Sequence, residues 1–330
     1  MKILIADSNK IPAVKYGGTE RVIWGLGKAL VSLGHTVYYL VAKGSSCPFA
    51  SEVFFYDPNK SLDKQIPDYI DVVHLNFQPS GPINKPYITT FHGNINSAVS
   101  FDRNTVFISG NQAKRYHGST YVYNGLDWSN YPKPALTASR NYFHFLGDAS
   151  WKVKNVKGAI AITKKADQRL VVIGGTRLNL NMGFRFTPDI HVRFKGSVDD
   201  AAKGKLMSAS KGLLFPVLWH EPFGLAIIES LYFGCPVFGT TYGSLPELVT
   251  GDVGFLSNSV TALANALTNA PGFSAAHCHE YAASQFNSSV MAQAYLRLYE
   301  KVLNGEQLHA THPFLPEHEI STVKRFQMDA

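Results

Sequence analysis

The sequence has few cysteines and no long apolar run. Its 330 residues include three cysteines, Cys47, Cys235 and Cys278, which lie far apart and form no C-x-x-C pair. An odd, scattered set predicts neither a disulfide framework nor a zinc knuckle and favours a reducing cytoplasm. No run of about 18 apolar residues occurs, so we expect no transmembrane helix. The apolar core of the first residues, "MKILIADSNK", is too short for a signal peptide and indicates a buried first strand.

The sequence also lacks the usual marks of nucleic-acid and NAD binding. No dense block of Lys and Arg with interleaved aromatics occurs, which argues against a nucleic-acid partner. The fingerprint G-x-G-x-x-G does not follow the first strand, and "GLGKAL" (25–30) lies inside a predicted helix, so a dehydrogenase is disfavoured. The net charge of +7 fits polyanionic small ligands, or peripheral contact with an anionic membrane face.

Short apolar runs alternate with helical patterns along the chain. With 45% hydrophobic and 17% charged residues, the composition is that of a well-buried protein, and the length suits two domains. Alternating strands and helices predict parallel sheets wrapped by helices. We expect helices at 19–34, 156–166, 290–305 and around "FGLAIIESLYFG", and strands at 2–6, 35–42, 71–77, 86–92, 104–110, 142–147, 169–175, 191–196, 211–217 and 235–240.

Two such cycles are separated by "YPKPALTASR" (131–140), which reads as a linker because it holds two prolines and small residues. The prediction is an α/β fold of two Rossmann-like domains, 1–135 and 136–305, that face each other across a cleft. Ligands of open α/β sheets bind beyond the carboxyl ends of the strands, so this cleft is the expected active site. The tail, 306–330, shows little periodicity and is either a strap on the N-terminal domain or a loose end.

Two segments could hold a phosphate. In "YGGTE" (16–20), Gly17 and Gly18 would let the backbone approach a phosphate at the start of a helix, and a plain loop-to-helix turn is the alternative reading. In "WKVKNVKG" (151–158), Lys152, Lys154 and Lys157 lie where a strand passes into a helix. These lysines could neutralise a diphosphate, or they form an ordinary solvated basic face.

The stretch "HEPFGLAIIES" carries two carboxylates, Glu221 and Glu229, at the ends of an apolar segment. Pro222 suits the first turn of a helix, which places Glu221 in the preceding loop and Glu229 about two turns into the helix. Backbone N–H groups at the helix start, together with the two acids, could hold a polyol.

This E-x7-E pattern resembles the signature of retaining glycosyltransferases of the GT-B fold, family 4. Further segments resemble motifs of that family in the same order along the chain, over about residues 1–305. They are "GGTE" (17–20), "FHG" (91–93), "NGLD" (124–127), "KGSVDDAAK" (195–203) and "GSLPELV" (243–249).

The resemblance implies a role for each matching residue. Glu221, His92 and Lys154 would be the catalytic residues, with Glu221 and the backbone of Phe223, Gly224 and Leu225 on the donor sugar. The diphosphate would be held by Gly17, Gly18, Lys152 and Lys154. Val198 and Lys203 would lie at the nucleotide base, and Glu229 would bind the ribose hydroxyls. One departure stands out, because the family's arginine at the end of the first strand is replaced by Asp148 or Ala149, and Lys152 is the substitute cation.

The function implied by the resemblance is transfer of a hexosyl group, with retention, from a nucleoside-diphosphate sugar to a saccharide, lipid-linked or small-molecule acceptor. A UDP-sugar is the first candidate for the donor and GDP-mannose the second. No D-x-D triplet occurs, so we expect neither a metal nor another cofactor. Two alternatives stay open: a nucleotide-sugar epimerase of the same architecture, and a nucleotide-sugar-binding protein without turnover.

Overall fold

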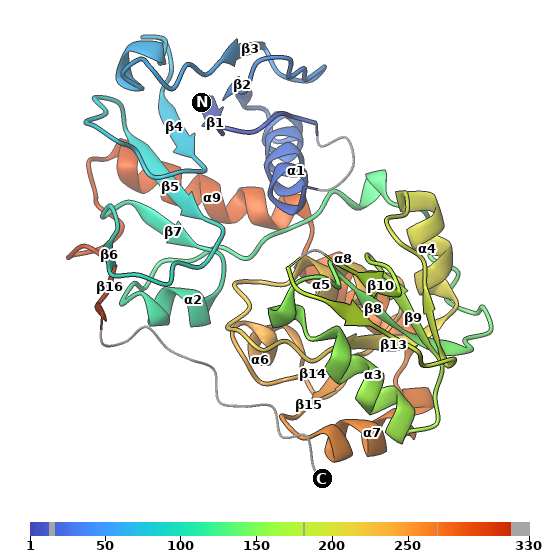
Figure 1. The fold of residues 1–330 in the computed structure, drawn as a ribbon. Coiled ribbons are helices and arrows are strands. Elements are labelled where there is room, and N and C mark those ends of the chain that lie inside the picture. Colours follow the sequence, from blue (N-terminus) through green and yellow to red (C-terminus); the bar gives the residue numbers. More distant parts are fainter. Residues whose placement is uncertain (13–16, 181, 269, 318–330) are drawn as a thin grey trace. The chain divides into compact units, whose positions relative to one another are not determined.

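The computed structural model describes residues 1–12, 17–180, 182–268 and 270–317. These residues fall into two compact units, each with its own parallel sheet (Figure 1). Unit 1 comprises Met1–Trp128 together with 286–317, and unit 2 comprises Ser129–Gln285. The expected fold class, α/β with two Rossmann-like halves, is confirmed.

Unit 1 is built on a six-stranded parallel sheet in the order β3-β2-β1-β4-β5-β7. The central strands are almost wholly buried because helices cover the sheet, which explains their continuous apolar runs. The strands are β1 Lys2–Ala6, β2 Thr36–Val41, β3 Glu52–Phe55, β4 Val72–Leu75, β5 Tyr87–Phe91 and β7 Thr105–Phe107, and the helices are α1 Gly18–Ser32, α2 Gly110–Arg115 and α9 Ser288–Leu303, with a short 3-10 turn at Asp63–Gln65.

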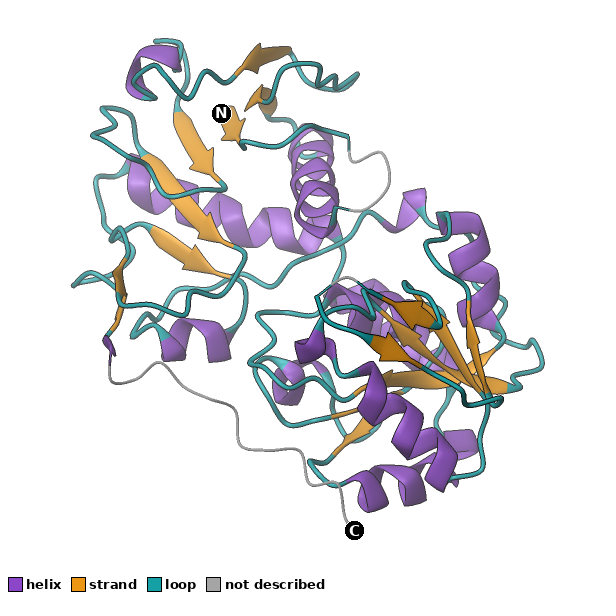
Figure 2. Ribbon diagram, viewed as in Figure 1, coloured by secondary structure: helices purple, strands orange, loops and turns teal. Residues whose placement is uncertain are grey.

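Unit 2 is also built on a six-stranded parallel sheet, in the order β12-β9-β8-β13-β14-β15. Helices α3 and α7 contact strands of this sheet, α4 and α5 contact β13, and α8 packs on α5; all helices are purple in Figure 2. The sheet strands are β8 Tyr142–Leu146, β9 Leu170–Ile173, β12 Val192–Phe194, β13 Ser210–Phe215, β14 Val237–Gly239 and β15 Gly254–Leu256. The helices are α3 Val156–Lys165, α4 Asp200–Ser208, α5 Leu225–Tyr232, α6 Leu245–Leu248, α7 Val260–Thr268 and α8 Ala275–Gln285, with 3-10 turns at Trp128–Asn130, Lys152–Lys154 and Ala270–Gly272.

Two antiparallel pairs lie outside the main sheets. In unit 2, β10 (Leu178–Asn179) and β11 (Arg185–Phe186) form a hairpin. In unit 1, β16 (Phe314–Leu315) pairs with β6 (Val99–Ser100). The backbone N–H of Phe101 also donates to the carbonyl of Pro313 at 2.8 Å, so the chain after 305 packs on unit 1 as far as Leu315.

The unit boundaries differ from the expected 135/136 and 305/306. Helix α9 follows unit 2 in the chain but packs on α1 and β5 of unit 1, because its buried tyrosines find polar partners there. Segment 131–140, expected as a linker, is part of unit 2. Arg140 donates to the carbonyls of Ser210 and Phe233 at 2.6 and 3.0 Å, and the backbone N–H of Ala135 donates to Ser208 Oγ at 3.3 Å. Proline content alone could not reveal these contacts with residues 70 or more positions away.

No described helix is both long enough and apolar enough to cross a membrane.

Candidate active site

The carboxyl ends of β8, β13 and β14 are tied together by hydrogen bonds between their loops. The backbone N–H of Leu218 donates to the carbonyl of Val153 at 2.7 Å, which joins the loop after β13 to the loop after β8. The backbone N–H of Ser244, after β14, donates to the carbonyl of Glu221 at 3.0 Å. Neighbouring parallel strands therefore deliver three loops to one edge of the sheet, which is where ligands of open α/β sheets bind.

The first acid of the E-x7-E pattern, Glu221, is buried against a lysine and a tryptophan. Lys154 Nζ lies 2.8 Å from Glu221 Oε2, and the indole N–H of Trp219 donates to the same oxygen at 2.6 Å. The Lys154 ammonium also lies over the rings of Trp219 and Phe215, 4.8 and 5.3 Å from their centroids. A buried carboxylate is compatible with folding when it is paired and hydrogen-bonded in this way.

The second acid, Glu229, has its own lysine. Lys203 Nζ lies 2.7 Å from Glu229 Oε1, and the Tyr131 hydroxyl donates to that oxygen at 2.8 Å. Both Lys203 and Glu229 are buried, and Lys203 also lies 3.2 Å from Asp200. Lys203, expected at the nucleotide base, is thus held at the carboxylate that was expected to bind ribose.

Helix α5 begins between the two acids. Its N-cap is Gly224, whose positive φ of 98° disfavours other residues, and Leu225 is the first helical residue. Phe223 is buried before it, and the hydroxyl of Ser244 donates to the Phe223 carbonyl at 2.5 Å. At Gly243, where φ is 68°, a Cβ would come within 2.3 Å of the Glu221 backbone, so this glycine lets the β14 loop press against the acid.

In unit 1, His92 follows β5 and is oriented by Asn76, which follows β4. The Asn76 side-chain amide donates to the carbonyl of Ala6 at 3.1 Å, which leaves its Oδ1 to accept from His92 Nε2 at 2.8 Å. Burial lowers the pKa of His92 to about 4, so the imidazole is neutral at pH 7. With the proton on Nε2, Nδ1 can only accept a hydrogen bond, for example from a sugar hydroxyl.

The glycine loop lies partly outside the described residues, since 13–16 are not placed. Gly17 is the N-cap of α1 with extended backbone and no side-chain cap, and Gly18 is the first helical residue. The N–H groups of the first turn therefore lack a capping side chain at this end, which is the geometry expected for a phosphate site.

The structure gathers part of the predicted set. It brings Lys154 to Glu221 and Lys203 to Glu229, with Phe223, Gly224 and Leu225 between the acids. Lys152 points elsewhere, with its Cε 3.4 Å from where a Cβ on Gly183 would be, and Val198 lies in the loop between β12 and α4. His92, Gly17 and Gly18 belong to unit 1.

Three polar contacts of the site were not foreseen from the sequence. Trp219 stands two positions before Glu221, so its closeness in the chain was an available signal. Asn76 is the second-last residue of the strand that was expected at 71–77, so its place near a carboxyl end was also readable. Tyr131 lies 98 positions from Glu229 in a segment interpreted as a linker, and no local pattern indicates it.

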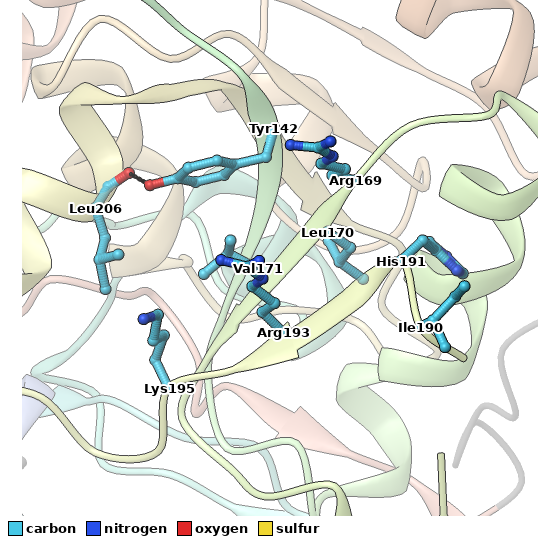
Figure 3. Close-up of a pocket in the computed structure, with 9 residues that line it drawn as sticks. All are labelled: Tyr142, Arg169, Leu170, Val171, Ile190, His191, Arg193, Lys195 and Leu206. Carbon is cyan, nitrogen blue, oxygen red and sulfur yellow. Dashed lines mark hydrogen bonds between the residues drawn. The ribbon is translucent and has the colours of Figure 1, made fainter. Parts of the chain in front are cut away.

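A separate pocket of about 380 Å³ opens beside the edge strand β12 (Figure 3). Tyr142, Leu170 and His191 line it from the starts of β8, β9 and β12, and the cations Arg169, Arg193 and Lys195 surround it. Since it contains none of the predicted site residues, we do not assign it to the donor. Among the described residues, no group of three or more His, Cys, Asp or Glu side chains could hold a metal ion.

Comparison with known proteins agrees with this geometry. Residues 128–270, which include both acid–lysine pairs, match the family described as "Glycosyl transferases group 1". The matched stretch is 143 of the 330 residues and lies almost wholly in unit 2.

Solved structures show the same fold. AviGT4, a glycosyltransferase involved in avilamycin A biosynthesis, is 22% identical with a TM-score of 0.74, over 92% of this chain and 98% of that one. Sucrose-phosphate synthase from Thermosynechococcus elongatus is 18% identical, with a TM-score of 0.69 over 92% and 100%. Anabaena HepE, solved with UDP and glucose, is 19% identical with a TM-score of 0.64 over 91% and 99%. These likenesses establish the GT-B fold.

One curated protein is similar in sequence over a shorter stretch. A 41.2 kDa protein in the cps region of Klebsiella pneumoniae is 29% identical over an alignment of 119 residues, and the match covers 33% of this chain. The match spans about a third of that protein's length, 32%.

Proposed function

We propose that the protein is a retaining glycosyltransferase of family 4 that transfers a hexosyl group from a nucleoside-diphosphate sugar. The observation that carries the proposal is the pair of buried acid–lysine contacts, Glu221 with Lys154 and Glu229 with Lys203, on either side of the start of one helix. A UDP-sugar is the first candidate for the donor, in keeping with the UDP and UDP-glucose that Anabaena HepE holds. GDP-mannose is the second candidate.

In this proposal, each acid–lysine pair contacts a different part of the donor. A departing pyrophosphate gathers negative charge, and Lys154 with the start of α5 would stabilise that charge electrostatically. Glu221 would hydrogen-bond the sugar and offset positive charge at its anomeric carbon. Glu229 would accept hydrogen bonds from the ribose hydroxyls, with Lys203 and Tyr131 keeping the buried carboxylate in place.

Retention would follow from front-face attack, in which the leaving phosphate takes the acceptor's proton. His92 would accept a hydrogen bond from a hydroxyl of the sugar, and Gly17 and Gly18 would meet the diphosphate through their backbone.

Lys154→Ala and Glu221→Gln test the catalytic assignment. Each removes one charge from the reacting region, so we expect the transfer rate to fall about 10²- to 10³-fold. Release of nucleoside diphosphate from UDP-glucose, UDP-N-acetylglucosamine and GDP-mannose, with a panel of saccharide acceptors, is the measurement. Lys157→Ala is the matched control, because Lys157 is exposed two residues into α3 and should keep the wild-type rate.

The same assay separates the alternatives. Full activity in both site variants would remove Lys154 and Glu221 from the mechanism. Conversion of the donor into another sugar nucleotide without any acceptor would indicate an epimerase. Donor-dependent thermal stabilisation with no nucleoside diphosphate released would indicate a binding protein. Glu229→Gln should reduce that stabilisation, and an unchanged donor affinity would reject its ribose role.

A further inference from the structure

The β10–β11 hairpin of unit 2 exposes a row of large apolar side chains. Leu178 and Phe186 are direct cross-strand partners, and Leu180, Met182 and Phe184 continue the same alternation toward the turn. All five are more than half exposed, and Leu180 and Phe184 expose 70% and 75% of their surface. We call these five residues the apolar row. Fractions this high mean that no neighbouring surface encloses the side chains, so the row is convex and not part of a groove.

The other face of the hairpin is firmly anchored. Arg185 is buried, donates to the hydroxyl of Thr187 at 2.7 Å and to the carbonyl of Thr176 at 2.9 Å, and lies over the Phe194 ring. Arg177 donates to the carbonyls of Asp189 and Val192 at 3.1 and 2.7 Å. Because the hydrogen bonds of Arg177 and Arg185 hold the hairpin in place, its exposed apolar face stands on a fixed backbone.

Cations stand beside the apolar row. A shallow hollow of about 420 Å³ is lined by Thr176 and Arg177 at the base of the hairpin and by Arg193 and Lys195 of the neighbouring edge. Within the part of the chain that the structure describes, the exposed side chains of Arg193 and Lys195 have no hydrogen-bond or ion-pair partner. Lys152, near Gly183 at the turn, adds a third positive charge. A convex apolar element with cations at its base is complementary to a bilayer surface that carries anionic headgroups.

We propose that the β10–β11 hairpin docks the protein on an anionic lipid surface. The apolar row enters the boundary between headgroups and acyl chains, and Arg193 and Lys195 contact lipid phosphates at the hollow. The hairpin also adjoins the loop after β8, since Ser150 Oγ lies 4.0 Å from Met182 Sδ, so docking would hold the Lys154 loop close to the membrane. This proposal stands on the hairpin alone and does not depend on the transferase function.

Sedimentation with vesicles tests the docking. We expect the wild-type chain to bind phosphatidylcholine vesicles that contain 30% phosphatidylglycerol, and to bind pure phosphatidylcholine at least tenfold more weakly. Leu180→Ser with Phe184→Ser should reduce binding at least tenfold, as should Arg193→Gln with Lys195→Gln, and added salt should weaken the wild type because the cations are exposed. Phe55→Ser is the matched control for the loss of an exposed aromatic, since Phe55 is 52% exposed in unit 1.

Two results would overturn the proposal. One is a wild-type chain that stays in the supernatant with anionic vesicles at low salt. The other is a concentration-dependent dimer, seen by light scattering, that the Leu180→Ser and Phe184→Ser variant abolishes, because the row would then be a protein interface. Failure of docking with normal transfer to a soluble acceptor would leave the transferase proposal standing, and the reverse pattern would leave the docking proposal standing.

Discussion

At the scale of single residues, Asn76 decides what His92 can do. The amide orientation puts the imidazole proton on Nε2, and burial keeps the ring neutral with a pKa of about 4. Asn76→Asp would place a carboxylate beside that nitrogen and so favour the protonated ring. We expect the pKa of His92 to rise and the low-pH limb of kcat/KM for transfer to move to higher pH.

An NMR titration of His92 alongside the kinetic profile checks this prediction. Asn59→Asp is the control, because it adds the same charge at an exposed position of unit 1. If the His92 titration moves but the rate profile does not, the imidazole has no part in transfer. If neither moves, the hydrogen bond to Asn76 does not set the protonation of the ring.

At the scale of elements, helix α9 belongs to unit 1 although the whole of unit 2, Ser129–Gln285, separates it in the chain from Met1–Trp128 of that unit. The Tyr299 hydroxyl lies 2.8 Å from His74 Nδ1 on β4, and His74 Nε2 lies 2.8 Å from Thr90 Oγ1 on β5. Tyr295 reaches the same threonine oxygen at 3.0 Å. All of these side chains are buried, so the network satisfies polar groups that would otherwise oppose the packing of α9 on the sheet.

Tyr299→Phe tests the importance of that network. The change leaves one nitrogen of buried His74 without its partner, which should lower the free energy of unfolding by about 1–3 kcal/mol. Urea unfolding measures the change, and Tyr121→Phe, at a 44% exposed tyrosine of the same unit, should be neutral. An equally stable Tyr299→Phe variant would mean that apolar contacts alone hold α9 in place.

Periodicity predicted some of the elements but not their long-range partners, and helices such as α4, α7 and α8 were not expected. The strand expected at 2–6 is β1 residue for residue, and the helix expected at 19–34 is α1 within two residues, because buried strands and amphipathic helices leave local patterns. The hairpin β10–β11 was not predicted, although apolar residues alternate there, because each of its strands is only two residues long. The assignment of α9 to unit 1 was also missed, because the partners of Tyr295 and Tyr299 lie more than 200 positions away.

In the candidate site too, the sequence revealed the features that are local in the chain and missed the long-range contacts. Glu221 and Glu229 could be singled out because their spacing around a helix start is local, and the nearby lysine of each pair came from motif order. Which lysine meets which acid depends on strand order, since β8 is the neighbour of β13 in the sheet. Tertiary hydrogen bonds such as that of Tyr131 to Glu229 leave no local trace in the sequence.

At the scale of the whole molecule, the sheet of each unit contains a buried, neutral histidine. Burial lowers the pKa of His74 to about 3 in unit 1 and that of His144 to about 3 in unit 2. His144 is held by two hydroxyls, those of Ser210 at 2.7 Å and Ser230 at 2.9 Å. With His92, three imidazoles stay unprotonated in the folded chain at pH values where the unfolded chain, with histidine pKa values of about 6.5, takes up protons.

Stability should therefore fall as the pH drops from about 6.5 toward 4. The unfolded state binds more protons in this window, so each of the three histidines lowers the free energy of unfolding by roughly 1.4 kcal/mol per pH unit once it is fully protonated in the unfolded chain. Thermal unfolding between pH 7.5 and 4.5 measures the slope. His144→Asn removes one of the three contributions, so its stability should change less steeply with pH than that of the wild type, even if the variant is less stable at pH 7.5. A melting temperature that stays level from pH 7 to 5 would show that these imidazoles are protonated in the fold, contrary to the burial and hydroxyl contacts that surround His74 and His144.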